Sequence, residues 1–209
     1  MPNKRNAAPL SSFMPALFML LVCEASYGIS VVDKSLEQLL KQSDDVIYGV
    51  VTDISARYAQ GEPSQQIYTF ITFSEIQSIK NSEENNQGEF LLRIAGGRVG
   101  SRAQVIPGAP KFQLGERYIL FVRGNNRLAF PLVGVNQGVL NAVLDKTKRG
   151  YRLIFKKRSR RILEQFQALR ENTGSSTPDR QGADISPQEF MEALSARWQQ
   201  LNAQKGLVQ

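Results

Sequence analysis

Residues 46–54, Val46-Ile47-Tyr48-Gly49-Val50-Val51-Thr52-Asp53-Ile54, and residues 67–76, Ile67-Tyr68-Thr69-Phe70-Ile71-Thr72-Phe73-Ser74-Glu75-Ile76, decide the fold class. Both stretches are rich in β-branched and aromatic residues, a composition typical of strands. In the second stretch, Ile71 and Phe73 face one side of a strand while Tyr68 and Phe70 face the other. The two stretches therefore predict two strands with apolar side chains on both faces.

Shorter stretches of the same kind follow, and glycine or proline separates nearly all of them. We expect strands at residues 90–95, 118–122, 128–132, 139–144 and 151–155. A short helix precedes them, because Ser35 and Gln38 have the spacing of a capping box and are followed by Leu39 and Leu40. Many short strands with Gly/Pro turns predict a mainly β fold, a small closed or nearly closed barrel, with a sandwich as the alternative.

The first 28 residues resemble a secretory signal peptide. Lys4 and Arg5 precede an apolar run at residues 13–23, which is too short to cross a bilayer as a helix. Ser26 and Gly28 place small residues before a cut after Gly28, and a cut after Ala25 is the second choice. We expect an exported protein, periplasmic or secreted, without a transmembrane segment after cleavage. A lipoprotein anchored at Cys23 is a minor alternative.

The rest of the chain divides into a barrel domain at residues 29–157 and a basic helical tail at residues 158–209. Apolar residues recur at helical spacing in both parts of the tail: Ile162, Leu163, Phe166 and Leu169, then Phe190, Leu194, Trp198 and Leu201. Between them, residues 171–185 have the composition of a flexible linker. Ser186, Pro187 and Glu189 mark the start of the second helix, which we expect to dock on its own domain. Because the linker is polar, we expect few contacts between tail and barrel, and a barrel that is stable alone.

A glycine-rich pattern in the centre of the chain resembles a family of exported bacterial proteins without an assigned activity. The pattern consists of Ala95-Gly96-Gly97-Arg98-Val99-Gly100, Pro107-Gly108-Ala109-Pro110-Lys111-Phe112 and Leu114-Gly115-Glu116-Arg117-Tyr118-Ile119-Leu120-Phe121. The likeness covers roughly residues 35–140. It implies a barrel similar to the OB-fold and to the netrin-like modules of tissue inhibitors of metalloproteases. Those inhibitors chelate metal through an N-terminal cysteine, which the mature chain lacks.

The composition excludes several chemistries. The chain has no histidine and one cysteine, so it has no Ser-His-Asp triad, no Cys-His pair and no thiolate or imidazole metal site after cleavage. We therefore expect no cofactor, no metal and no catalytic residues. Adjacent carboxylates at residues 44–45 and 83–84 point apart in an extended chain and make no acid/base pair. Glu116, where a turn enters a strand, is expected to pair with an arginine or to cap backbone N–H groups.

Two surfaces are candidates for binding. The first is the loop with Gly96, Gly97, Arg98, Gly100 and Arg102, in which positive φ angles at a turn are a better explanation of the glycines than a phosphate cradle. The second lies within residues 146–161, which hold nine basic residues and no acid. The candidate polyanion-binding residues there are Lys156, Lys157, Arg158, Arg160 and Arg161. We expect Tyr151, Leu153 and Phe155 to share an inward face.

The sequence favours an exported, non-enzymatic binding module for a protein, an anionic glycan or an anionic membrane surface, with nucleic acid disfavoured by export. A secreted-protease inhibitor or accessory protein is one alternative. A hydrolase using carboxylates or Ser/Lys chemistry is the other. For the basic residues, a second interpretation stays open: a solvated surface that only keeps the protein soluble.

Overall fold

A computed structural model describes the following residues: 33–59, 66–80, 88–147, 149–156, 159–172 and 185–206. All of them belong to one compact unit. The expected signal peptide, the carboxylates at 83–84 and most of the expected linker lie outside the described residues.

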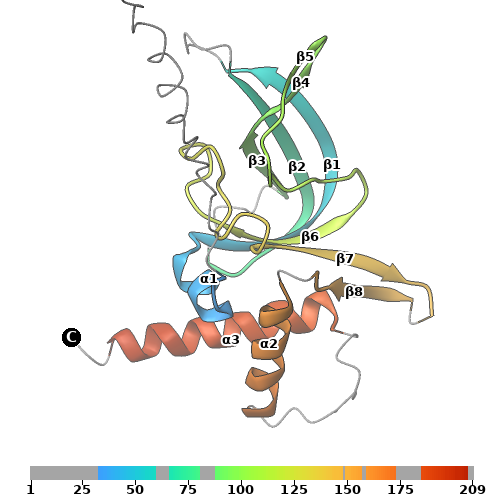
Figure 1. Ribbon diagram of the computed structural model, residues 1–209. Coiled ribbons are helices and arrows are strands. Elements are labelled where there is room, and N and C mark those ends of the chain that lie inside the picture. Colours follow the sequence, from blue (N-terminus) through green and yellow to red (C-terminus); the bar gives the residue numbers. More distant parts are fainter. Residues whose placement is uncertain are drawn as a thin grey trace, which may run out of the picture. The chain divides into compact units, whose positions relative to one another are not determined.

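The fold is mainly β, as the sequence predicted. Six strands form one antiparallel sheet in the order β3-β2-β1-β6-β7-β8 (Figure 1). Their bounds are Asp45–Tyr58 (β1), Ile67–Ser78 (β2), Glu89–Ala95 (β3), Arg117–Val122 (β6), Val139–Asp145 (β7) and Gly150–Ile154 (β8). The long strand β1 is central because it pairs with β2 from Ile47 to Tyr58 and with β6 from Asp45 to Val50.

Two differences from the expected strands lie in the connections. A short hairpin, β4 (Gly97–Val99) and β5 (Arg102–Gln104), occupies the glycine-rich loop. The expected strand at residues 128–132 is wrong: bends replace it, and its one β-bridge is that of Leu132 with Val122. The reason is local, because Arg127 and Leu128 donate back to the carbonyl of Gly124 and Pro131 has no N–H to give to a ladder.

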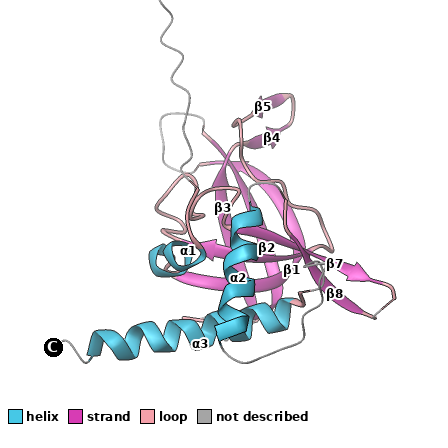
Figure 2. Ribbon diagram, turned by 60° about the horizontal axis from the view of Figure 1, so that its bottom comes forward, coloured by secondary structure: helices cyan, strands magenta, loops and turns pink. Residues whose placement is uncertain are grey.

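The two faces of the sheet bury two separate apolar clusters. One cluster fills the bend of β1, β2 and β3 and contains Phe73, Ile71, Leu92 and Tyr118. The other lies between the β6-β7-β8 half of the sheet and three helices, which Figures 1 and 2 show together on one side. These are α1 (Leu36–Gln42), α2 (Arg160–Asn172) and α3 (Pro187–Gly206).

Local capping signals explain where two of the helices begin. Ser35 and Gln38 form the predicted capping box of α1. At α3, Ser186 Oγ accepts from the N–H of Glu189 at 3.1 Å, as expected. The carboxylate of Glu189, however, pairs with Arg170 of α2 at 3.0 Å. The charge of Glu189 thus joins the two tail helices.

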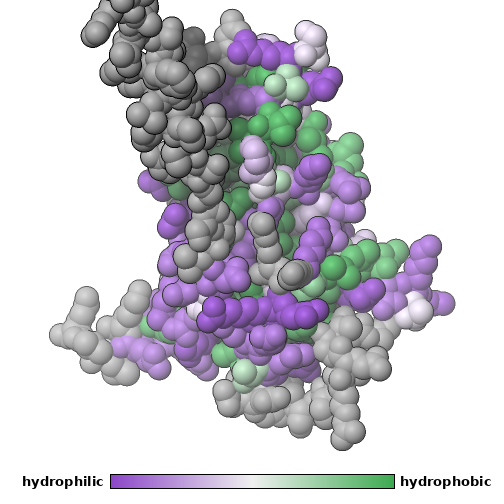
Figure 3. Space-filling view, viewed as in Figure 1, coloured by the Kyte–Doolittle hydropathy of each residue, from purple (hydrophilic) through white to green (hydrophobic). Residues whose placement is uncertain are grey.

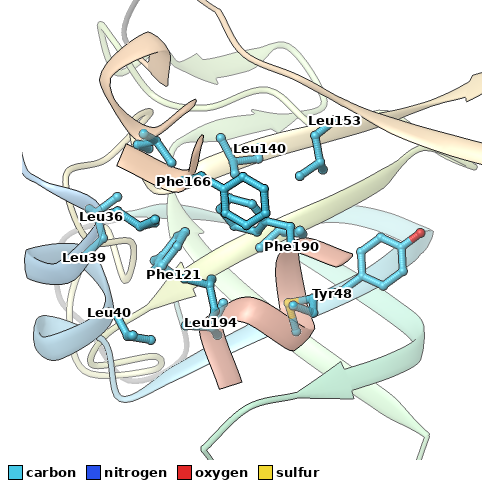
Figure 4. Packing of buried hydrophobic residues seen from close by; sticks show 14 of the residues in the cluster. Leu36, Leu39, Leu40, Tyr48, Phe121, Leu140, Leu153, Phe166, Phe190 and Leu194 are labelled. Carbon is cyan, nitrogen blue, oxygen red and sulfur yellow. The ribbon is translucent and has the colours of Figure 1, made fainter. Parts of the chain in front are cut away.

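The expectation that few contacts join the tail to the barrel is wrong. Phe166 of α2 and Phe190 of α3 are fully buried against Tyr48, Phe121 and Leu140 of the sheet (Figure 4). The prediction was based on the polar composition of the linker. That composition describes the connection only and says nothing of how the apolar faces of α2 and α3 pack. Docking of the C-terminal helix on its own domain is confirmed.

The described pairings leave β3 and β8 at the two ends of the sheet, so closure of a barrel stays a prediction. Each end strand is nevertheless covered in part. At β3, the Asn125 side chain accepts from Arg93 N–H at 3.2 Å and donates to the Leu91 carbonyl at 2.8 Å. At β8, the N–H of Leu153 donates to the carbonyl of Ile185 at 2.8 Å. Within the described part of the chain, no helix is both long and apolar enough to cross a membrane.

Candidate functional site

Two glycines of the first candidate loop, Gly96 and Gly97, lie where a side chain would clash, whereas Gly100 has open space around it. Gly96, Gly97 and Gly100 have φ angles of +98°, +134° and +58°, as the turn explanation requires. A Cβ atom on Gly97 would stand only 2.5 Å from Thr69 Oγ1. Because glycine has no Cβ, β4 can lie tightly against β2. The N–H of Gly96 already donates to the Ile67 carbonyl at 2.8 Å, so it is not free to bind an anion. Arg98 and Arg102 are exposed on this hairpin.

The basic run from Lys146 to Arg161 is divided by the structure into two groups. Lys146 and Arg149 lie in the turn that joins β7 to β8, and Lys156, Arg160 and Arg161 lie where β8 gives way to α2. An extended chain rises about 3.3 Å per residue, so the two groups stand on the order of 20 Å apart. Lys148, Lys157 and Arg158 lie outside the described residues. An elongated or extended ligand could therefore contact both groups at once.

These five cations are exposed, and none forms an ion pair within the described part of the chain. Several cations elsewhere are held by the protein itself. Lys41 and Arg197 both pair with Glu37, and Arg117 pairs with Glu75. Lys80 donates to the Ser43 carbonyl at 2.6 Å and lies over the ring of Trp198. Of the described cations in the basic run, only Arg152 has an acidic neighbour, Asp145 at 3.9 Å, so the charges of the other five face the solvent.

The inward face of β8 is confirmed. Leu153 is buried, and Tyr151 and Phe155 pack partly buried against the helix-side cluster. The guanidinium carbon of Arg117 also lies over the Tyr151 ring, 4.9 Å from the ring centre. These side chains connect the basic run to the core and are not part of its exposed surface.

Among the described residues, the Glu116 carboxylate neither pairs with an arginine nor caps a backbone N–H, so that expectation is wrong. Its Oε2 accepts from the hydroxyl of Tyr118 and, at 3.0 Å, from Nδ2 of Asn141. Burial, with the hydrogen bond to Glu116 next in size, raises the pKa of Tyr118 above its ordinary value of 10.0. The protonated Tyr118 hydroxyl and the Glu116 carboxylate therefore form a hydrogen-bonded contact that helps to hold β6 and β7 together.

The carboxylates of Asp44 and Asp45 point apart, as predicted. Asp44 accepts from the N–H of Gly124 at 2.7 Å and lies 3.7 Å from Arg127. Asp45 is buried and accepts from the N–H of Val46 and Lys80 and from the Ser78 hydroxyl. In the described residues, no group of three acidic, cysteine or histidine side chains is placed to hold a metal ion.

A groove of about 280 Å³ lies where α1, α2 and α3 meet. Leu36, Leu40 and Leu194 line its apolar part, and the ion pair of Glu37 with Arg197 stands at its rim. The hydrogen bond to Lys41, followed by that to Arg197, lowers the pKa of Glu37. Because both partners already hold this carboxylate, the groove presents little free charge.

Two exposed apolar residues lie beside the basic turn, and the sequence did not lead us to expect them there. Val143 and Leu144, at the end of β7, are 41% and 51% exposed. Two consecutive apolar residues break the alternation of a half-buried strand, and this signal stands in the sequence directly before Asp145 and Lys146. The structure therefore places exposed apolar side chains and exposed cations on one hairpin.

No protein-family model, curated protein or solved structure matches the chain in the comparisons made. The resemblance to a family of exported bacterial proteins thus stays a prediction carried by the quoted motifs.

Proposed function

We propose that the protein is an exported, non-enzymatic binding module whose basic run binds a ligand with many negative charges. The observation that carries the proposal is the exposure of Lys146, Arg149, Lys156, Arg160 and Arg161 without acidic partners in the described chain. Export rests on the signal-peptide pattern of residues 1–28.

Electrostatics favour a polyanion as the ligand over a single small anion. Isolated exposed charges contribute little, but several cations acting together release bound counterions when they meet a polyanion. Arg160 and Arg161 also stand at the beginning of α2, where no acidic side chain occupies the first turn. The partial positive charge of a helix N-terminus adds to theirs.

The sequence and the carboxylate geometry support a non-enzymatic role. The chain has no histidine to act as a base. Glu116, the carboxylate with the most suggestive position in the sequence, is bonded by Tyr118 and Asn141. A general base needs a free carboxylate within reach of substrate, and Glu116 is occupied by its own neighbours.

The test is elution from a heparin column along a salt gradient. We expect the protein to be retained and the triple variant Lys156→Glu, Arg160→Glu, Arg161→Glu to elute at clearly lower salt. Reversal at Arg160 and Arg161 puts acids at a helix N-terminus, which favours the helix, so the variant should fold.

The matched control is Lys111→Glu, Arg123→Glu, Arg127→Glu, which makes the same change in net charge on other exposed residues. We expect it to shift elution much less, because it leaves the basic run intact. Equal elution of both triple variants would show that net charge alone sets retention, and the run would then be a solvated surface.

A further inference from the structure

The end of the β7–β8 hairpin is a two-stranded ribbon that leaves an apolar side chain partly exposed on each face, Val143 on one and Leu144 on the other. The pairing of β6 with β7 ends at Ala142, and residues 143–145 pair only with β8. Figures 1 and 2 show this hairpin reaching past the helices, and Figure 3 shows apolar surface over β7 with hydrophilic surface at its tip. Val143 and Leu144 are neighbours in the strand, so their side chains leave opposite faces of the ribbon.

Three described cations lie on the same ribbon as these two apolar side chains. Lys146 and Arg149 are exposed in the turn, and Arg152 lies across from Val143 on the same face. Asp145 is the one acid of this ribbon, and it accepts from Thr147 and lies 3.9 Å from Arg152. The end of the hairpin therefore offers apolar surface framed by a net positive charge.

Arg149 occupies a backbone position that suits glycine better. Its φ angle is +51°, in the left-handed region, where a side chain other than glycine or asparagine costs about 1 kcal/mol. The turn thus carries a cation at a position where glycine would be more stable. This cost makes Arg149 useful as a probe, because its loss should not weaken the fold.

We propose that the end of this ribbon, residues 143–147 and 149–152, dips into an anionic lipid surface, so that Val143 and Leu144 on its two faces reach the acyl chains and the cations keep their charged ends at the phosphates. The proposal rests on the polyanion binding proposed above and names its target. A lipid surface fits both features at once, since a polysaccharide would meet the charges but leave the apolar side chains exposed. A fluid medium also covers apolar groups on both faces of a ribbon, which a flat protein surface does not.

Neither feature is strong enough alone. Two half-exposed aliphatic side chains give a modest gain on leaving water, and stable membrane association generally takes two signals. Lysine and arginine can keep their charged ends at the phosphates while their stems lie along apolar groups. Binding should therefore need negative lipid and the two aliphatic side chains together.

The test is co-sedimentation with vesicles of phosphatidylcholine, alone or mixed with phosphatidylglycerol. The chain is used from Ile29, because the compact unit lies beyond it and the apolar run at residues 13–23 would itself bind lipid. We expect binding to mixed vesicles only. The double variant Val143→Ser, Leu144→Ser should bind them about tenfold more weakly and elute from heparin as the original does.

Two further variants sharpen the result. Arg149→Gly should bind mixed vesicles about fivefold more weakly while its unfolding midpoint stays equal or rises. Val105→Ser, at an apolar residue 83% exposed elsewhere, should bind like the original chain. Retention on heparin without vesicle binding, or equal vesicle binding by the double variant, overturns the lipid proposal and leaves polyanion binding standing. If the original chain is not retained on heparin, both the lipid proposal and the proposed polyanion binding are overturned.

Discussion

At the residue scale, the hydrogen bonds of Glu116 show how this protein uses a carboxylate to join strands. Glu116 lies directly before β6, and its Oε2 accepts from Tyr118 of β6 and from Asn141 of β7, so one oxygen atom connects two strands. The Tyr118 hydroxyl also accepts from the N–H of Gln113 at 3.2 Å, before the strand begins. A buried hydroxyl with both a donor and an acceptor is costly to remove, because its partners are left unsatisfied.

Tyr118→Phe should lower the free energy of unfolding by about 1 kcal/mol and change its dependence on alkaline pH. Because the pKa of Tyr118 is raised in the folded protein, its contribution is complete below pH 10.0 and is lost as pH rises through the folded value. The variant should therefore lose less stability above pH 10.0 than the original chain.

Chemical unfolding measured at neutral and alkaline pH checks this. Some alkaline loss should remain in the variant, since burial also raises the pKa of Tyr48. Tyr58→Phe, at an exposed position, is the control and should leave stability unchanged. An identical alkaline decline in Tyr118→Phe and the original would contradict the assignment.

At the element scale, the helices are held by contacts between residues far apart in the chain, which no local sequence pattern predicts. Gln165 of α2 accepts from the N–H of Leu36 at the beginning of α1, across 129 residues of chain. Lys80, after β2, reaches the carbonyl of Ser43 after α1 and the ring of Trp198 in α3. Capping at Ser35 and Ser186 was predictable because each signal lies within one helical turn. The joining of the helices was not, because it depends on side chains brought together only by the fold.

Phe190→Ala should lower the free energy of unfolding by about 3–5 kcal/mol, a typical cost for emptying a fully buried aromatic site. Phe190 is fully buried, with its ring centre 4.8 Å from that of Phe166 and 6.2 Å from that of Phe155. Denaturant unfolding measures the loss, with Gln188→Ala at an exposed position of the same helix as control. A loss below 1 kcal/mol would mean that α3 contributes little to the core, as the polar linker had suggested.

At the scale of the whole molecule, the sheet must keep its end strands from pairing with other chains. The alternation of apolar residues predicted most strands and the mainly β class. The alternation did not predict which groups bond to the open edge of β3, because these groups come from the irregular segment between β6 and β7. The segment between β6 and β7, of which residues 128–132 were expected as a strand, instead sends the Asn125 amide to β3, and the carbonyl of Ala129 accepts from Ala95 N–H at 2.8 Å. The same limit applies to the binding surface: the sequence indicated the basic run but not the ribbon that carries three of its described cations, Lys146, Arg149 and Arg152.

The Asn125 side chain does for β3 what a neighbouring strand would do, because its amide gives one donor and one acceptor to the edge. Asn125→Ala should lower the free energy of unfolding by about 1–3 kcal/mol and open the edge to pairing with another copy. The control is Asn136→Ala, which loses one hydrogen bond to the Gly108 carbonyl in a loop and leaves the sheet edge intact. Sedimentation over a range of concentrations should show self-association of Asn125→Ala and monomers of Asn136→Ala. If both variants stay monomeric at all concentrations, the Asn125 amide stabilises its loop without protecting the edge, and other contacts of the turn segment must keep β3 from pairing.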